Sequence, residues 1–188
     1  MKVNANTLRI GHVIEHNNRL WVVTKTQTVQ PGKGGAFLTA VLKDLRNGTK
    51  LDERWRTQES VERVSLEDRE FQYLYPEDEL HTFMDVETFD QITVAGSVIG
   101  DPVVFLQEGM KVNVRLFEGQ AVSVELPGSV VLTVTETDPA VKGQTAAASY
   151  KPAMTDNGVR VMVPPHIDAG TRIVVNTQDG SYLERFKD

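Results

Sequence analysis

Apolar and polar residues alternate with a period of two through most of this chain, and many of the apolar residues are β-branched. Residues 111–116 show this alternation, and residues 20–26 and 36–43 are runs rich in apolar and β-branched residues; both patterns are typical of β-strands. The 3.6-residue period of long helices is nearly absent. One short helix is predicted at Asp101, a good N-cap, with Pro102 at the first helical position. The sequence therefore predicts an all-β fold.

A repeat in the second half of the chain indicates how the strands are grouped. Residues 109–122 and 170–183 place a Gly, a basic residue, a β-branched residue and a Val at the same offsets, and both copies then reach an acidic–Gly turn. The simplest account is two similar small β-barrels in tandem, each ending in a hairpin. A chance match between two short hairpins is the alternative. Five-stranded OB barrels fit a unit of about 60 residues and often bind oligonucleotides.

Turn signals divide the chain further. Asn47-Gly48 predicts a two-residue hairpin turn. Residues 30–35 are a Pro- and Gly-rich loop between two predicted strands, where regular pairing cannot continue. A chain of 188 residues accommodates three domains only if each is a small barrel. With a boundary near Pro127-Gly128, the predicted domains are residues 1–63, 64–127 and 128–188.

The net charge is −6, but the charge is distributed unevenly along the chain. Residues 1–63 hold 11 Lys and Arg against 6 Asp and Glu, a net of +5, whereas residues 64–126 hold 3 against 13, a net of −10. A basic end is attracted to phosphates and an acidic middle is repelled by them. The pattern therefore indicates an oriented nucleic-acid partner. Acidic residues that merely keep the middle of the chain soluble are the alternative.

The sequence shows no constellation for catalysis or metal binding. The chain has no Cys, which excludes disulfides and thiolate sites. His12 and His16 are four residues apart, but they lie in a strand-and-turn region where this spacing does not put them on one face. The Gly-rich loop lacks the Walker pattern. We therefore expect no enzyme, no metal site and no cofactor.

A membrane span and a secretory signal are not expected either. No run approaches the roughly 18 apolar residues that a membrane helix needs. The first residues have no apolar h-region. The expectation is a cytoplasmic protein without a membrane partner.

Lys33 is the unusual residue of the predicted loop. Gly32 precedes it, and Gly34 and Gly35 follow, so that a partner can approach the backbone closely. Pro31 restricts the loop on one side. Composition alone favours the alternative, an ordinary surface lysine in a hairpin loop.

Four motifs lie in order along essentially the whole chain. They are Leu8-Arg9-x-Gly11-x-Val13-Ile14, then Pro31-Gly32-Lys33-Gly34-Gly35-Ala36-Phe37, then Asp138-Pro139-x-x-Lys142-Gly143-x-Thr145-Ala146, and last Lys151-Pro152-Ala153 with Gly158, Val161-x-Val163-Pro164 and Gly170. One of them alone, the Gly-Lys-Gly loop above all, is a weak signal. Together they resemble the elongation factor P family, and this resemblance is specific.

The resemblance implies a fold and a function. The fold would be three β-barrels, a KOW/SH3-like domain and two OB-folds, in an L shape like that of transfer RNA. The protein would be a translation elongation factor that binds the ribosome between the P and E sites and stimulates peptide-bond formation. It would relieve stalling at consecutive prolines by positioning the CCA end of peptidyl-tRNA. Its partners would be ribosomal RNA, peptidyl-tRNA and a lysine-modifying enzyme, and we expect a monomer.

The resemblance also implies roles for two loops. Lys33 would contact the CCA end and would carry a covalent β-lysyl-type extension, on a tip formed by Pro31, Gly32, Gly34 and Gly35. The third-domain loop would contact the D-arm of transfer RNA through Lys142, Gly143, Gln144, Thr145 and Ala146. Gln144 and Ala147 depart from the Asp and Gly that the family often carries there, and Gln144 removes a charge while keeping hydrogen-bonding groups.

Two other functions are compatible with the residues. One is that of an elongation-factor-P-like paralogue, which shares the fold and differs in the tip loop. The other is a general single-strand RNA-binding OB protein, which would need exposed aromatic residues for base stacking. Aromatic residues make up only 7% of the chain, and Trp21 and Trp55 lie in strand-like segments, so we predict that both tryptophans belong to the core.

Overall fold

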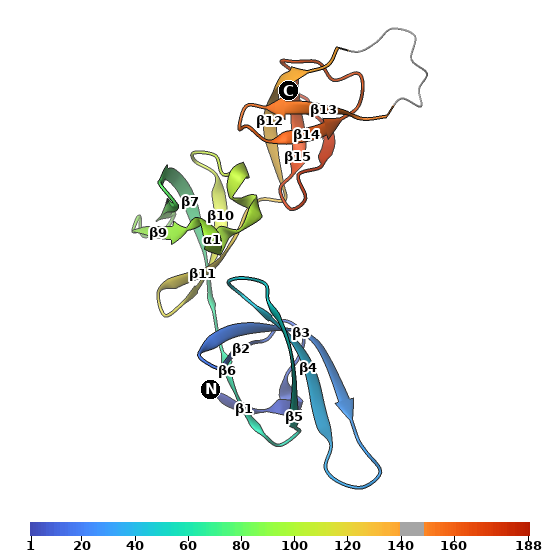
Figure 1. Ribbon diagram of the computed structural model, residues 1–188. Helices are drawn as coiled ribbons and strands as arrows, with labels where there is room; N and C mark the ends of the chain where they lie inside the picture. Colours follow the sequence, from blue (N-terminus) through green and yellow to red (C-terminus); the bar gives the residue numbers. More distant parts are fainter. Residues whose placement is uncertain (140–148) are drawn as a thin grey trace. The chain divides into compact units, whose positions relative to one another are not determined.

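The computed structural model describes residues 1–139 and 149–188, and strands dominate this part of the chain (Figure 1). They form three sheets, one of six strands and two of five. The predicted all-β fold is therefore confirmed. In the described residues, no helix is both long enough and apolar enough to cross a membrane.

The first sheet has the strand order β1-β6-β2-β3-β4-β5. Its core includes Ile14, Trp21, Leu42 and Trp55, all of them buried. Successive residues of a strand point to opposite faces, so the period-two pattern places these side chains together. Both tryptophans belong to the core, as predicted. The elements are β1 (Lys2–Asn4), the 3₁₀ helix η1 (Ala5–Thr7), β2 (Val13–His16), β3 (Arg19–Val29), β4 (Phe37–Asp44), β5 (Lys50–Arg56) and β6 (Ser60–Val64).

The turn between β4 and β5 lies where Asn47-Gly48 predicts one, but it is longer than predicted. The Asp44 N–H donates to the Thr49 carbonyl at 2.8 Å, so that residues 45–48 form the loop. The Asp44 carboxylate accepts hydrogen bonds from the backbone N–H groups of Arg46 (2.7 Å) and Asn47 (3.3 Å). This local bonding stabilises the wider turn, which explains why the two-residue prediction is wrong.

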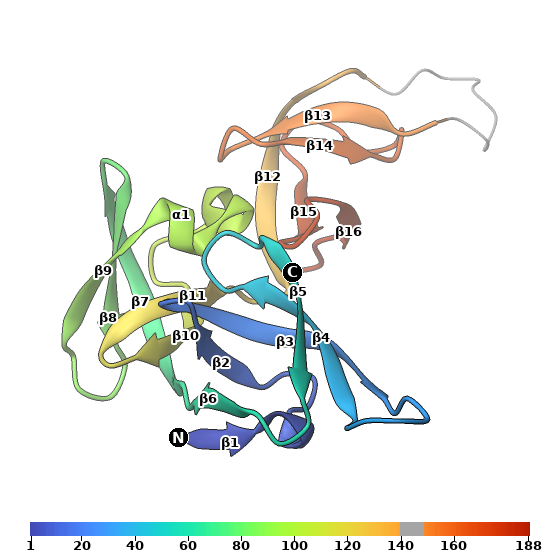
Figure 2. The same cartoon turned by 60° about the horizontal axis from the view of Figure 1, so that its bottom comes forward.

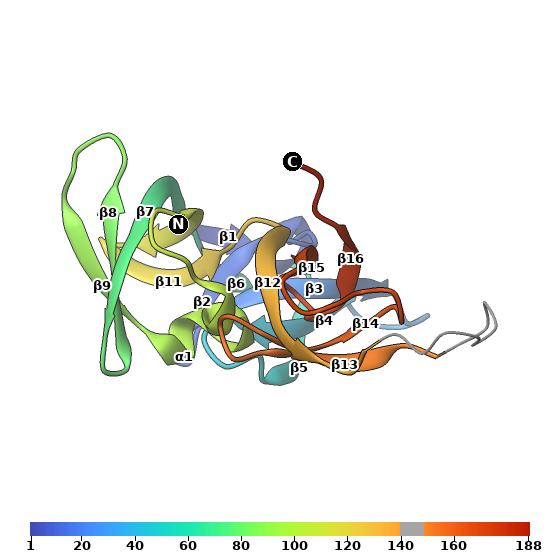
Figure 3. The ribbon, with the colours of Figure 1, turned by 90° about the horizontal axis from the view of Figure 1, so that it is seen from above.

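The second sheet has the strand order β11-β10-β7-β8-β9, and β8 and β9 run side by side as a twisted hairpin (Figure 3). Two short helical segments connect β9 to β10. Gly100, with φ of +81°, ends the first segment and is the N-cap of the second. Asp101 is therefore the first residue of a 3₁₀ helix, and the prediction that it is the N-cap is wrong. Glycine adopts this φ without strain. The elements are β7 (Glu67–Glu77), β8 (Leu80–Asp85), β9 (Gln91–Ala95), α1 (Gly96–Ile99), η2 (Asp101–Phe105), β10 (Lys111–Phe117) and β11 (Gln120–Glu125).

A histidine pairs with a buried tyrosine across β7 and β8. The Tyr73 hydroxyl lies 3.1 Å from His81 Nδ1, and burial lowers the pKa of His81 and raises the pKa of Tyr73. Since the pKa of His81 is lower in the folded state, the unfolded chain binds more protons below about pH 6.5, and stability falls as the pH falls.

We therefore expect His81→Gln to lose less unfolding free energy than the wild type between about pH 7.5 and about pH 5.5. Urea unfolding at the two pH values measures the difference. His12→Gln should change the loss in the same direction, because burial and the charges of Arg63 and Arg9 lower the pKa of His12 as well. An identical loss in the wild type and in His81→Gln would contradict the expectation.

The third sheet has the strand order β14-β13-β12-β15-β16. Numbered along the chain within each sheet, the strands of the second and third sheets have the same order, 3-2-1-4-5. The two copies of the sequence repeat lie on the last two strands of each sheet, so the prediction of two similar folds in tandem is confirmed. The elements are β12 (Ser129–Thr137), β13 (Lys151–Thr155), β14 (Arg160–Val163), β15 (Arg172–Asn176) and β16 (Tyr182–Arg185).

The chain forms two compact units, residues 1–70 with 113–124 and residues 71–112 with 125–188. Within the second unit, Phe105 of η2 lies in the buried cluster of the third sheet. The Asn157 side-chain amide also donates a hydrogen bond to the Val104 carbonyl at 3.0 Å. These contacts attach η2 to the third sheet. The predicted division into domains 1–63, 64–127 and 128–188 stays a prediction.

Candidate functional site

The Lys33 loop lies at the end of a long two-stranded hairpin (Figure 2). β3 and β4 stay paired as far as Val29 and Phe37, so residues 30–36 form the loop. The Lys33 side chain is exposed, and none of the hydrogen bonds and ion pairs found among residues 1–139 and 149–188 involves its amine. The amine is therefore free to reach a partner outside the chain.

Open space surrounds the glycines of this loop. A Cβ added at Gly32, Gly34 or Gly35 would meet no atom within 4 Å. Gly34 has φ of +110°, a conformation that favours glycine. Internal packing therefore does not require the other two glycines. What their missing side chains provide is a narrow loop that another molecule can approach closely.

The strands behind the loop carry a basic face that sequence reasoning missed. Cross-strand pairing of β3, β4 and β5 places Lys25, Lys43, Lys50, Arg54 and Arg56 on the face opposite the core. We call this the outer face. All five cations are exposed, and Asp52 is the acidic residue among them. The outer face therefore attracts phosphates. Period-two spacing of the charges carried this signal, but using it required the register of the strands.

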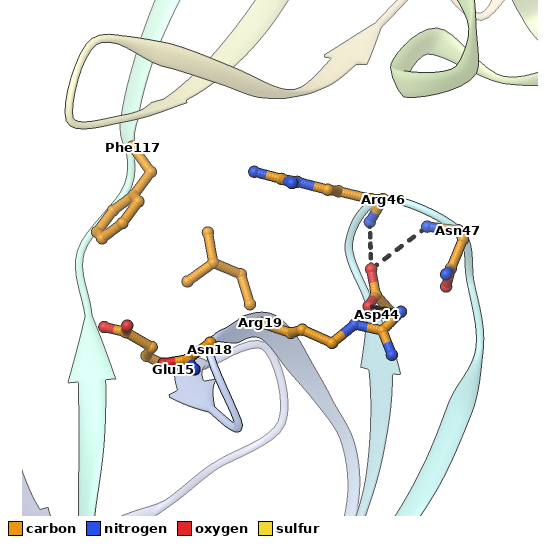
Figure 4. Close-up of a pocket in the computed structure, with 8 residues that line it drawn as sticks. Glu15, Asn18, Arg19, Asp44, Arg46, Asn47 and Phe117 are labelled. Atoms are coloured by element: carbon orange, nitrogen blue, oxygen red, sulfur yellow. Dashed lines mark hydrogen bonds and ion pairs between the residues drawn. The ribbon is translucent and has the colours of Figure 1, made fainter.

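A cavity of about 260 Å³ lies in the first unit, beside the turns of the first sheet (Figure 4). The Asp44 carboxylate, only 3% exposed, forms an ion pair of 2.7 Å with the Arg19 guanidinium and also holds the turn after β4. These bonds occupy both carboxylate oxygens, so Asp44 shapes the wall and is not a free base. The lining residues are Glu15, Asn18, Arg19, Leu20, Asp44, Arg46, Asn47 and Phe117.

The predicted transfer-RNA loop lies mostly outside the described residues. This applies to all five residues named for it, Lys142, Gly143, Gln144, Thr145 and Ala146. The strands that flank the loop are held together at their ends. The Thr137 hydroxyl donates to the Pro152 carbonyl at 3.0 Å, and the Lys151 amine donates to the Asp138 carbonyl.

His12 and His16 have separate environments. His12 Nδ1 accepts a hydrogen bond of 3.1 Å from the Arg9 N–H, whereas His16 Nε2 lies 3.2 Å from Glu53 Oε1. The structure does not bring the two rings to one site. Among the described residues, no group of three or more His, Cys, Asp or Glu side chains is arranged to hold a metal ion.

Comparison with known proteins gives matches along almost the whole chain. Three family profiles match it in succession: the elongation factor P KOW-like domain over residues 4–61, the elongation factor P OB domain over residues 66–124, and the elongation factor P C-terminal domain over residues 130–185. Two curated relatives named elongation factor P match over the full length of both chains. The protein of Rhodospirillum centenum is 60% identical, and that of Gluconobacter oxydans is 55% identical.

A solved structure supports the fold. Eukaryotic translation initiation factor 5A from Methanococcus jannaschii matches with a TM-score of 0.55 at 21% identity. The match covers 66% of this chain and 95% of that one. Together with the family profiles, it confirms the predicted KOW-like and OB folds.

Proposed function

We propose that this chain, which belongs to the elongation factor P family and is a translation elongation factor, presents Lys33 to the CCA end of peptidyl-tRNA on the ribosome, between the P and E sites. The observation that carries the proposal is the exposed Lys33 side chain at the end of the paired β3–β4 hairpin. The glycines around it leave room for RNA. The outer face adds cations for neighbouring phosphates of ribosomal RNA or transfer RNA.

The proposed contact acts on geometry and not on protons. Proline is conformationally restricted and participates poorly in peptide transfer, so the P-site substrate spends little time in the attack geometry. A cation bound to the CCA backbone holds the reacting end in place, which lowers the entropic part of the barrier. The ribosome carries out the reaction, and the factor contributes no general acid or base. Relief of stalling at consecutive prolines follows.

A second contact is proposed for the C-terminal part of the chain. The loop of residues 142–146 would bind the D-arm of the same transfer RNA. Its support is the motif that begins at Asp138-Pro139 and the match of the C-terminal family profile. Two contacts on one transfer RNA would select for a ribosome that holds peptidyl-tRNA in the P site.

Reconstituted translation tests the proposal. Adding the protein should raise the single-turnover rate constant for Pro–Pro bond formation at least about tenfold, because positioning removes part of the barrier. A message without consecutive prolines is the control, and its rate should change much less. Equal rates with and without the protein on the Pro–Pro message would contradict the proposal.

We also propose that Lys33 carries a β-lysyl-type extension in the native host. Trypsin cuts after an unmodified Lys33 and gives peptides 26–33 and 34–43, whereas an extended side chain should block this cut. The expected product is therefore one peptide of residues 26–43, heavier by one lysyl residue. Protein made without a modifying enzyme is the control. The two short peptides from the native host would remove the modification but not the contact of Lys33 with transfer RNA.

A further inference from the structure

An aromatic ring and a guanidinium meet at the base of the tip loop. Phe37 is the first residue of β4, directly after the loop, and its strand partners are Val29 and Arg56. The guanidinium carbon of Arg54 lies 4.0 Å from the centroid of the Phe37 ring. Arg54 is the diagonal neighbour of Phe37 on the outer face, a position from which long and aromatic side chains reach one another.

A main-chain bond restrains the same side of the loop. The Thr57 N–H donates to the Ala36 carbonyl at 3.1 Å. Between these contacts, Trp55 is buried opposite Leu38, which fixes this part of β5 to the core. The residues at the C-terminal end of the loop are thus attached to β5 twice, once through the backbone and once through the Phe37 ring.

The residues at the N-terminal end of the loop have weaker restraints. Val29, Gln30 and Pro31 are exposed. Pro31 restricts its own φ but cannot donate a backbone hydrogen bond. The direction in which the loop leaves the hairpin therefore depends on the side that contains Phe37.

We propose that Arg54 is a positioning residue for Lys33. By stacking on Phe37, it limits the movement of the strand end at which the loop is anchored, and so keeps Lys33 directed away from the barrel. The inference rests on the proposed function of Lys33. An exposed cation–π contact of this kind is worth about a two- to fivefold change in the activity that depends on it.

Arg56 provides a matched control on the same face. It is two residues from Arg54, it is exposed, and it lies directly opposite Phe37. The cation–π contacts found among the described residues involve Arg19, Arg54 and Arg172. Replacing either Arg54 or Arg56 by Ala removes one positive charge from the outer face, but only the first change removes the stack on Phe37.

A double-mutant cycle in polyproline rescue tests the assignment. Arg54→Ala and Phe37→Leu should each lower rescue about two- to fivefold, and the double variant should be no worse than either one alone. Arg54→Lys, which keeps a cation near the ring, should restore part of the loss. Arg56→Ala should lower rescue less than Arg54→Ala, because it removes the same charge from the outer face but no stack on Phe37. An Arg54→Ala change that combines additively with Phe37→Leu, or that leaves wild-type rescue, would overturn the proposal.

Two further measurements separate the possible causes. Circular dichroism of each variant should match the wild type, and the midpoint of thermal unfolding should fall by no more than the loss of one cation–π contact accounts for, since the core stays intact. Lys33→Ala in the same assay tests the proposed function itself. If Lys33→Ala is inactive while the Arg54 cycle is additive, the positioning role alone is wrong. If Lys33→Ala retains full rescue, the proposed function is wrong.

Discussion

Lys33→Ala should reduce rescue of a polyproline reporter to the level of cells without the factor, while the protein stays folded. The side chain is exposed, so its removal costs the fold almost nothing. On the ribosome it supplies the cation that holds the CCA end, and no other side chain of the loop is charged. The measurement is the reporter signal in a strain that lacks its own factor, with expression of each variant checked.

Two variants define what the rescue depends on. Lys43→Ala removes an exposed cation on the outer face, away from the loop, and should lower rescue only slightly. Lys33→Arg keeps the positive charge but not the amine that a modifying enzyme extends, so partial rescue would separate charge from modification. Full rescue by Lys33→Ala would refute the role assigned to this residue.

Phe105→Ala should destabilise the third sheet by about 3–5 kcal/mol, because it leaves a cavity where a large ring was buried. Phe105 is 5% exposed and packs in the same cluster as Leu132 and Ile173. Gly180 also lies against its ring, since a Cβ there would be 3.7 Å from Phe105 Cζ. One side chain from η2 thus completes the core of another sheet.

Amide hydrogen exchange measures this effect by region. Protection of β12 and β15 should fall in Phe105→Ala, whereas protection of β3 and β4 should not change. Phe105→Leu, which fills most of the space, should cost less than Phe105→Ala because it leaves a smaller cavity. Val104→Ala is the neighbouring control, as that side chain is 48% exposed. Unchanged protection of β12 and β15 would show that Phe105 is not part of their core.

Much of the fold could be predicted because alternation with a period of two is a local signal. The strands around residues 20–26 and 36–43, the burial of Trp21 and Trp55, and the repeat on β10–β11 and β15–β16 all follow from side chains that must share a face. The length of one turn and the first residue of one helix could not be predicted from residue type. Asp44 widens the turn through its own hydrogen bonds, and the φ of Gly100 shifts the start of η2.

In the candidate site, too, local features could be predicted from the sequence and features that depend on strand pairing could not. The motif around Lys33 is local, and its position between two strands could be predicted from the glycines and the flanking segments rich in apolar and β-branched residues. The stack of Arg54 on Phe37 depends on which residues of β4 and β5 face one another. That register follows from the wider turn at residues 45–48, so a two-residue turn predicts the wrong neighbours. The roles of the site residues stay predictions.

A photo-crosslinker at position 30 tests most directly whether the tip reaches the CCA end of peptidyl-tRNA. Gln30 is exposed, and Lys33 and the glycines beside it are retained. On ribosomes stalled at consecutive prolines, the predicted result is a crosslink to the terminal nucleotides of the P-site transfer RNA, and competition with unlabelled protein should remove it. Crosslinks that appear only on other RNA or on ribosomal proteins would contradict the proposed function.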